Sequence, residues 1–235
     1  MLELPIAGAE ERYSVKPSKI IALGLNYDDH VKESVFLKAK NFTPERPTEP
    51  VLFPKTPNVL IGPGQAIIIP AFLKEYNFDD LRIDYEAELA VIIKDRCKNV
   101  SAEEAYSHVY GYTCINDVSQ RNFQTSDKSG WFRGKSLDTF GPVGPVVLRH
   151  EDAGDPQNLR ITCRLNGETV QDSNTSMMIF GIPETISFIS RHFTLEAGDI
   201  IATGTPKGVG RLHHGDVVEI EIEKIGVLRN TVVEE

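Results

Sequence analysis

Long apolar runs, cysteine pairs and a surplus of basic residues are all missing from this sequence of 235 residues. No apolar stretch approaches the roughly 18 residues that a membrane-spanning helix needs, so we expect no membrane partner. Residues 1–11 lack the basic start and apolar centre of a secretory signal. The cysteines, Cys97, Cys114 and Cys163, are far apart and form no Cys-x-x-Cys pair. Such usage is typical of thiols in a reducing compartment, so we expect a cytoplasmic protein.

The charge balance is acidic. The chain has 25 Lys and Arg residues against 34 Asp and Glu residues, a net charge of −9. Non-specific binding to nucleic acid or to an anionic membrane needs a basic surface, so we expect neither partner. An anionic small molecule remains compatible, because an acidic protein can still contain a local basic pocket.

Several familiar catalytic signatures are also missing. No Ser-His-Asp or Cys-His arrangement with a recognisable nucleophile elbow occurs. The glycine-rich segment Thr203–Gly210 lacks the Gly-Lys-Ser/Thr ending of a P-loop. Its glycine density indicates either a loop whose backbone amides bind an anion or an ordinary tight turn.

The pattern of elements predicts a β-rich α+β fold. Many short apolar runs are separated by Gly and Pro turns, and they do not alternate regularly with helices, which disfavours a doubly wound parallel sheet. Asn166-Gly167 predicts a hairpin, and apolar residues behind Pro183 recur at helical spacing. Ser101 and Glu104 match a capping box, which predicts a second helix ending near Gly111. We expect a roll or barrel-like sandwich with a few peripheral helices.

A strand with paired carboxylates is the strongest chemical signal. Residues 82–93 alternate between apolar and polar, which places Glu86 and Glu88 on one face, roughly 7 Å apart. Two like charges this close cost free energy unless a cation or water separates them. Asp117 follows another apolar run and can converge on the same point. Three oxygen ligands suit Mg²⁺, Mn²⁺ or Ca²⁺; the alternative is the solvent-facing side of an ordinary strand.

His30 and Glu33 are three residues apart. On a helix they share a face, and a carboxylate that holds an imidazole orients it for acid–base chemistry. The alternative is a routine charged pair on a surface helix.

The polar segment from Gln120 to Asp138 is predicted to be a functional loop. In it, Arg121 and Gln124 lie four and seven residues after Asp117, so all three face one way in a helix or tight turn. Lys135 follows an aromatic pair; it is either a surface lysine or a cation that stabilises a developing oxyanion.

The order of the motifs resembles one family. The matching residues are Asn26-Tyr27 with His30 and Glu33, Phe53-Pro54-Lys55-Thr56-Pro57, Asp84-Tyr85-Glu86-Ala87-Glu88, Asn116-Asp117-Val118-Ser119 with Arg121, Gly134-Lys135-Ser136 with Asp138, and Thr203-Gly204-Thr205-Pro206 with Gly208. From about Lys19 to Val233 the chain looks like the fumarylacetoacetate hydrolase family. The resemblance implies a mixed β-sandwich roll in which residues 19–235 are the catalytic domain and residues 1–18 a short lead-in. It also implies that the protein is a homodimer.

The resemblance also implies roles for individual residues. It implies one Mg²⁺ or Mn²⁺ ion held by Glu86, Glu88 and Asp117. It implies a catalytic dyad of His30 and Glu33 on a segment that orders as a lid over the substrate. It implies that the 2-oxo-carboxylate is held by Arg121, Gln124, Lys135 and Thr205, with Lys135 also placed for catalysis.

The chain resembles the shorter branch of the family, which includes acylpyruvate hydrolases, oxaloacetate decarboxylases and isomerases of homoprotocatechuate breakdown. These enzymes act on 2-oxo acids through a metal-stabilised enolate. The presence of both His30 and Glu33 favours hydrolysis of the carbon–carbon bond of an acylpyruvate-type 2,4-dioxo acid. The alternatives are an oxaloacetate decarboxylase, a 2-hydroxyhepta-2,4-diene-1,7-dioate isomerase, or a non-catalytic protein that binds a metal or a 2-oxo acid. Contacts to the distal part of the substrate are expected in Leu37–Arg46 and Gln124–Phe132.

Overall fold

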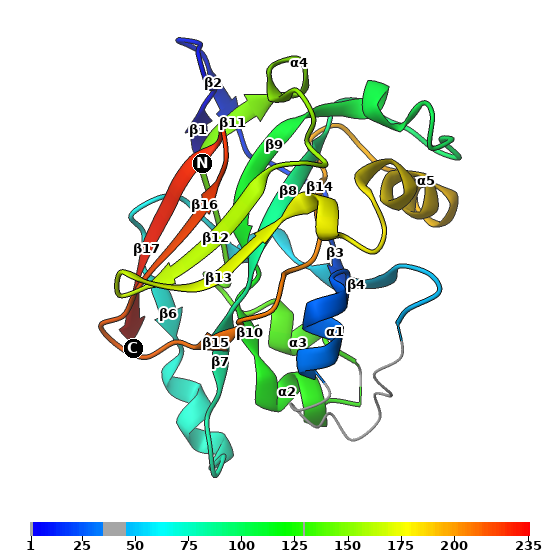
Figure 1. The fold of residues 1–235 in the computed structure, drawn as a ribbon. Coiled ribbons are helices and arrows are strands. Elements are labelled where there is room, and N and C mark those ends of the chain that lie inside the picture. The colour runs from blue at the N-terminus through cyan, green and yellow to red at the C-terminus, as the bar shows by residue number, and fades with distance from the viewer. Residues whose placement is uncertain (1, 35–45, 129) are drawn as a thin grey trace.

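The computed structural model describes residues 2–34, 46–128 and 130–235. In this part of the chain the strands form four sheets (Figure 1). The largest sheet has the strand order β4 (Val51–Lys55), β3 (Ile20–Gly24), β14 (Ile200–Ala202), β8 (Ala87–Ile93), β9 (Val109–Asn116), β11 (Gly141–Arg149) and β5 (Leu60–Ile61). The second sheet has the order β13 (Glu168–Asn174), β12 (Arg160–Leu165), β16 (Val217–Ile222), β17 (Gly226–Glu234) and β6 (Ile67–Ile69).

Two small sheets and several helices complete the described part of the fold. The small sheets are β10 (Ser119–Gln120), β7 (Ile83–Tyr85) with β15 (Gly210–Arg211), and the hairpin of β1 (Glu3–Pro5) with β2 (Arg12–Ser14). The α-helices are α1 (Asp28–Ser34), α2 (Arg121–Ser126), α3 (Phe132–Lys135), α4 (His150–Ala153) and α5 (Ile182–His192). The 3₁₀ turns are η1 (Pro57–Val59), η2 (Ala71–Tyr76), η3 (Ala105–His108) and η4 (Thr175–Met177). None of these helices is long and apolar enough to cross a membrane.

The strand pairing confirms the predicted β-rich, mixed sandwich roll. Most neighbouring strands are antiparallel, but β3 with β14, β5 with β11 and β6 with β17 are parallel. The five-stranded sheet lies across one face of the seven-stranded sheet, and α1, α2 and α3 gather at one end of both (Figure 1). The predicted hairpin at Asn166-Gly167 is present between β12 and β13, with positive φ angles of 53° and 86°.

Strand β8 runs through the centre of the molecule and is buried on both faces. Leu89 and Val91 join the core between the two large sheets, whereas Ala90 and Ile92 join a second core on the opposite face. Leu4 of the N-terminal hairpin belongs to this second core. Burial on both faces explains why the sequence of β8 is apolar at nearly every position.

The predicted amphipathic helix behind Pro183 is confirmed as α5. Gly181 is its N-cap residue, and Ile182, Ile186 and Ile189 are fully buried in the main core. Proline at the second position is compatible with the first turn, where its missing N–H costs nothing.

The predicted helix from Ser101 to Gly111 is wrong. The capping contacts do form, because Ser101 and Glu104 exchange hydrogen bonds of 3.1–3.4 Å. They start only the short 3₁₀ turn η3, and β9 already begins at Val109. Pairing of β9 with β8 along its whole length overrides the local preference for a helix.

Two other expectations need correction. The segment from Gln120 to Asp138 is not a loop in its described residues, because α2 and α3 lie within it. Residues 82–93 do not form one strand, since Ile83–Tyr85 form β7 of a small sheet and the chain enters the large sheet only after Glu86, as β8. The expected distal contacts in Leu37–Arg46 lie, apart from Arg46, outside the described residues.

Candidate active site

The break between β7 and β8 brings two acidic residues together. Ala87 pairs with Asn116 at the end of the β8–β9 ladder, so Glu86 and Asp117 are the next residues on the two strands. The N–H of Asp117 donates to the carbonyl of Glu86 at 2.9 Å, and the side chain of Asn116 accepts from the N–H of Glu86 at 3.0 Å. The sequence therefore places both carboxylates at one end of the sheet.

Glu86, Glu88 and Asp117 form one cluster. One carboxylate oxygen of each lies within 4.8 Å of the others, and all three residues are buried. Burial at 4%, 1% and 0% exposure excludes the solvent-facing strand that the sequence left open. A buried group of three carboxylates needs compensating positive charge.

Two lysines from different elements supply part of that charge. The ammonium group of Lys135, on α3, lies 2.7 Å from Oε2 of Glu86 and 2.6 Å from Oδ2 of Asp117. Lys55, on β4, lies 2.6 Å from Oδ1 of Asp117 and donates to the carbonyl of Lys135 at 2.5 Å. Sequence reasoning quoted Lys55 only within a motif and assigned it no role; its apolar neighbours on a strand were the available signal.

The pKa values show which carboxylate lacks compensation. Burial raises the pKa of Glu86, but the charges of Lys135 and Arg121 outweigh it and hold the pKa well below its usual range. Burial, with the charges of Asp117 and Glu86, raises the pKa of Glu88 well above its usual value. The N–H of Gly204 donates to Glu88 at 2.8 Å and offsets only part of this. Glu88 is therefore the carboxylate of the cluster with the least compensating positive charge.

These residues fit a divalent cation. They offer three converging carboxylate oxygens, the ligand type that Mg²⁺ and Mn²⁺ prefer. A bound cation would also favour the ionised form of Glu88, which burial and its acidic neighbours disfavour.

Arg121 is enclosed by acceptors. Its Nε lies 2.8 Å from Asp84, its Nη1 donates to Gln124 at 2.9 Å, and its Nη2 lies 2.6 Å from Glu86. Arg121 and Gln124 share one face of α2, as their spacing predicted. Asp84 is fully buried and also accepts from Nε of Arg82. Sequence reasoning assigned no role to Asp84 or Arg82.

His30 and Glu33 are in contact on α1. Nδ1 of His30 lies 3.3 Å from Oε2 of Glu33. Both oxygens of Glu33 accept from the N–H of Gly208 at 3.1 Å. Lys207 lies 3.3 Å from Asp29, so two contacts tie α1 to the glycine-rich segment. The segment, expected to be either an anion-binding loop or a tight turn, donates two backbone N–H groups to carboxylates of the protein itself, Gly208 to Glu33 and Gly204 to Glu88.

Thr205 is held by a buried glutamine. Gln171 donates to Oγ1 of Thr205 at 2.9 Å and to the carbonyl of Pro206 at 2.8 Å. Its own side-chain oxygen accepts from the N–H of Ala87 at 3.1 Å. Gln171 therefore links the glycine-rich segment to the start of β8; nothing in the sequence singled it out.

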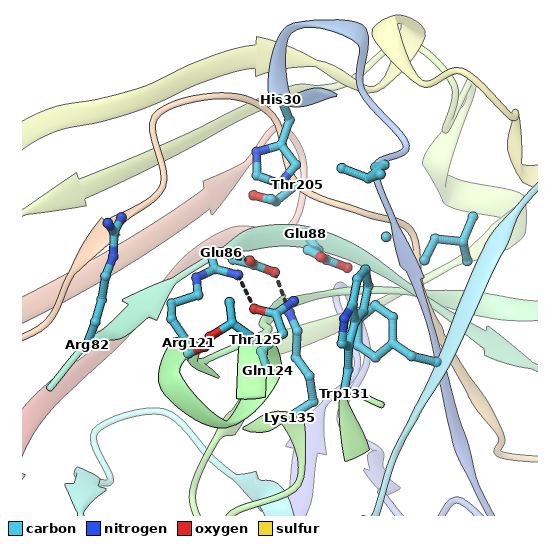
Figure 2. Close-up of a pocket in the computed structure, with 14 residues that line it drawn as sticks. His30, Arg82, Glu86, Glu88, Arg121, Gln124, Thr125, Trp131, Lys135 and Thr205 are labelled. Atoms are coloured by element: carbon cyan, nitrogen blue, oxygen red, sulfur yellow. Dashed lines mark hydrogen bonds and ion pairs between the residues drawn. The ribbon is translucent and has the colours of Figure 1, made fainter. Parts of the chain in front are cut away.

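One pocket is lined by most of the predicted site residues (Figure 2). The predicted residues that line it are His30, Glu86, Glu88, Arg121, Gln124, Lys135 and Thr205. Of the other two, Asp117 bonds Lys135 and is fully buried, and Glu33 contacts His30. Thr125 and Trp131 also line it and belong to Gln124–Phe132, where distal contacts were expected. The lining residues that had no role predicted from the sequence are Leu23, Gly24, Leu25, Phe53 and Arg82.

The aromatic part of the wall depends on a glycine. The rings of Phe53 and Trp131 meet edge to face with centroids 5.2 Å apart. A Cβ atom at Gly24 would lie 2.6 Å from Cζ3 of Trp131. Gly24 is therefore required for the indole ring to lie against β3 at this position.

The pocket combines carboxylates that can hold a metal ion with a His–Glu pair that can move a proton. The chain belongs to the family described as fumarylacetoacetate (FAA) hydrolase C-terminal, which matches residues 19–233.

Known proteins similar to this chain carry out several reactions. Oxaloacetate tautomerase Fahd2a, mitochondrial, of Rattus norvegicus is 40% identical over 225 residues, which cover 93% of this chain and 67% of that protein. Fumarylpyruvate hydrolase from Pseudomonas aeruginosa, solved in complex with Mn²⁺ and pyruvate, has a TM-score of 0.85 and 29% identity, covering 100% of this chain and 96% of that one. The 2-hydroxyhepta-2,4-diene-1,7-dioate isomerase from Mycobacterium marinum has a TM-score of 0.80 and 36% identity, covering 96% and 82%. The family identifies an enzyme, and these names span hydrolysis, isomerisation and tautomerisation.

Proposed function

We propose that this protein is a divalent-metal-dependent hydrolase that cleaves the carbon–carbon bond of an acylpyruvate-type 2,4-dioxo acid. The observation that carries the proposal is the His30–Glu33 contact, formed at the pocket that also contains Glu86 and Glu88. Cleavage by water needs a general base beside the anion-stabilising groups, and this pocket contains both.

The residues that would hold Mg²⁺ or Mn²⁺ are Glu86, Glu88 and Asp117. When bound, the ion supplies a Lewis acid for the oxygens of a 2-oxo acid. The similar hydrolase solved with Mn²⁺ and pyruvate supports this cofactor and this class of ligand.

Lys135 places a second positive charge at the same point. Burial lowers the pKa of Lys135, but the charges of Asp117 and Glu86 outweigh burial and raise it, so the ammonium form persists at neutral pH. A fixed cation stabilises the negative charge that develops on the keto oxygen when the carbon–carbon bond breaks. Arg121, Gln124 and Thr205 line the same pocket and bind the carboxylate of the 2-oxo acid.

His30 acts on water. When its Nδ1–H donates to Glu33, Nε2 keeps the lone pair that a general base needs. Nε2 takes a proton from water as the water oxygen bonds to the distal carbonyl carbon. The carbon–carbon bond then breaks, its electrons pass to the pyruvate enolate, and His30 returns the proton to the enolate carbon. The products are a carboxylic acid and pyruvate.

A second candidate is proton transfer or decarboxylation on oxaloacetate. It is supported by the 40% identity to an oxaloacetate tautomerase. Tautomerisation moves a proton between carbon and oxygen without attack by water, so His30 and Lys135 suffice. A third candidate, isomerisation of a dienol dioate, is supported in the same way by the similar isomerase.

One substrate panel separates these reactions. The protein is incubated with acetylpyruvate, oxaloacetate and a 2-hydroxydiene dioate, and each ultraviolet spectrum is followed with and without a chelator. We expect acetylpyruvate to be cleaved to acetate and pyruvate, the chelator to abolish turnover, and Mg²⁺ or Mn²⁺ to restore it. Unchanged turnover in the chelated protein contradicts the metal. Enol–keto conversion or decarboxylation of oxaloacetate without cleavage of acetylpyruvate supports the second candidate instead.

The homodimer and the cytoplasmic location stay predictions. Light scattering of the purified protein tests the first, and fractionation of the source cells tests the second.

A further inference from the structure

We propose that Arg82 binds a second carboxylate on the substrate, so that the pocket prefers 2-oxo acids with a carboxylate at each end. The inference rests on the proposed function in one respect, namely that the acidic cluster receives the 2-oxo acid end of the substrate. It adds the chemistry of the other end, which neither the family nor the named relatives assign to a residue of this chain.

Arg82 lies directly before β7 and lines the pocket. Its Nε donates to both oxygens of Asp84, at 2.9 and 3.1 Å. The Arg82 side chain is 32% exposed, whereas Asp84 is completely buried. Asp84 therefore orients a guanidinium group that still reaches solvent at the pocket.

The two arginines of the pocket differ in how many N–H donors remain available to a ligand. Each nitrogen of the Arg121 guanidinium already contacts one protein acceptor, which leaves one N–H on Nη1 and one on Nη2 for the 2-oxo-carboxylate. By contrast, among the described residues neither Nη1 nor Nη2 of Arg82 donates a hydrogen bond. Two adjacent N–H donors on one guanidinium match the two oxygens of a carboxylate.

The need for a counter-ion to Asp84 does not explain why Arg82 lies here. Asp84 already has Arg121 as a buried counter-ion at 2.8 Å. The position of Arg82 in the pocket also argues for a ligand. Figure 2 shows Arg82 on the opposite side of the acidic cluster from Trp131. Phe53 packs edge to face against Trp131 on that side.

The backbone of Arg82 is held independently of its side chain. Its N–H donates to Oδ1 of Asn122 at 2.9 Å, and its carbonyl accepts from the N–H of Arg121 at 2.9 Å. Replacing the side chain leaves these bonds in place and leaves Asp84 paired with Arg121. A change in ligand preference can therefore be attributed to the guanidinium group.

The test uses two probes that share a five-carbon 2-oxo acid skeleton. These are 2-oxoglutarate, with a distal carboxylate, and 2-oxopentanoate, with a distal methyl group. Calorimetry in the presence of Mg²⁺ gives the dissociation constant of each for the wild-type protein, Arg82→Gln and Arg82→Lys. We expect the wild type to prefer 2-oxoglutarate by at least tenfold, Arg82→Gln to reduce the ratio about tenfold or more, and Arg82→Lys to keep part of it.

Arg149→Gln is the matched control. Arg149 has a similar exposure of 33%, pairs with Glu11 at 2.7 Å, and does not line the pocket. The control should keep the wild-type ratio. The proposal is overturned if the wild type shows no preference, if it binds neither probe, or if Arg82→Gln weakens both probes equally.

Failure here is distinguishable from failure of the proposed function, because binding of the probes does not require turnover. A clear preference for 2-oxoglutarate without cleavage of any acylpyruvate refutes hydrolysis and keeps the role of Arg82. Cleavage of acylpyruvates without any preference for 2-oxoglutarate supports hydrolysis and refutes the role of Arg82.

Discussion

Lys55 and Asp117 form an ion pair of 2.6 Å in which neither side chain is exposed to solvent. Burial lowers the pKa of Lys55 and the charge of Lys135 lowers it further, while Asp117 and Glu86 act in the opposite direction. The pair joins β4 to the end of β9, and the carbonyl of Lys135 is a further acceptor for the same ammonium group. Lys55 thus fixes a carboxylate and a lysine of the site at once.

Replacing Lys55 should destabilise the protein strongly. Lys55→Met removes one partner of a buried pair and leaves Asp117 to Lys135 alone, so we expect a loss of about 3–5 kcal/mol in the free energy of unfolding. Urea denaturation measures it. Arg160→Met breaks the exposed pair of Arg160 with Asp172 and should cost less than about 1 kcal/mol. Equal effects of the two substitutions would contradict the importance of burial.

Stability of the metal-free protein should depend on pH through Glu88. Burial and the charges of Asp117 and Glu86 raise the pKa of Glu88, so its protonated form favours folding. This contribution is present below the pKa in the unfolded chain, about 4.3, and is lost as the pH rises through the raised value in the folded protein.

Chelated protein should therefore lose stability across that window, and Glu88→Gln should make the dependence flatter. Denaturant titrations at several pH values measure this, with the exposed Glu168→Gln as control. Adding Mg²⁺ should oppose the loss, because a bound cation favours the ionised carboxylate. If Glu88→Gln leaves the pH dependence of stability unchanged, that dependence comes from other groups.

Substitutions in the His30–Glu33 pair should separate catalysis from metal binding. His30→Ala removes the general base, so kcat for acylpyruvate cleavage should fall by about 10²–10⁴-fold. Glu33→Gln should have a smaller effect, since the amide oxygen can still accept from His30. Affinity for Mn²⁺ should change little in both, because neither residue belongs to the carboxylate cluster. His213→Ala, at an exposed position, is the control; retained hydrolysis in His30→Ala would remove His30 from the mechanism.

Gly208 should tolerate no side chain. Its φ of +96° disfavours other residues, and a Cβ atom would lie 2.0 Å from the carbonyl oxygen of Val170. Gly208→Ala should therefore destabilise the protein and loosen the contact of its N–H with Glu33. Gly215→Ala has a similar φ of +89° but open space, so it measures the backbone cost alone, about 1–2 kcal/mol. Thermal unfolding of both variants tests the expectation that Gly208→Ala loses more.

The sequence predicted those elements whose local signals agree with their tertiary contacts. The turn at Asn166-Gly167 requires positive φ angles, which both residues adopt in the structure. Ser101 and Glu104 were misleading because a capping box specifies only where a turn starts. How far the turn extends was decided by pairing of β9 with β8, which depends on residues distant in the sequence.

The same difference applies to the site. Glu86 and Glu88 were singled out because two carboxylates two residues apart on a strand face one way, and the resemblance to the family then implied a role as metal ligands. Gln171 and Asp84 were not, since their roles arise from contacts with Thr205 and with two arginines that only the folded chain brings together. Buried positioning groups of this kind leave no local pattern to detect.

Strand β8 separates two apolar cores that share it, with Leu89 and Val91 on one side and Ala90 and Ile92 on the other. Deleting one residue from this strand would exchange the two sets and misplace Glu88 in the same step. The chain length between Glu86 and Ile93 is therefore as tightly constrained as its composition. Insertions and deletions among related proteins should therefore occur in connections outside residues 86–93.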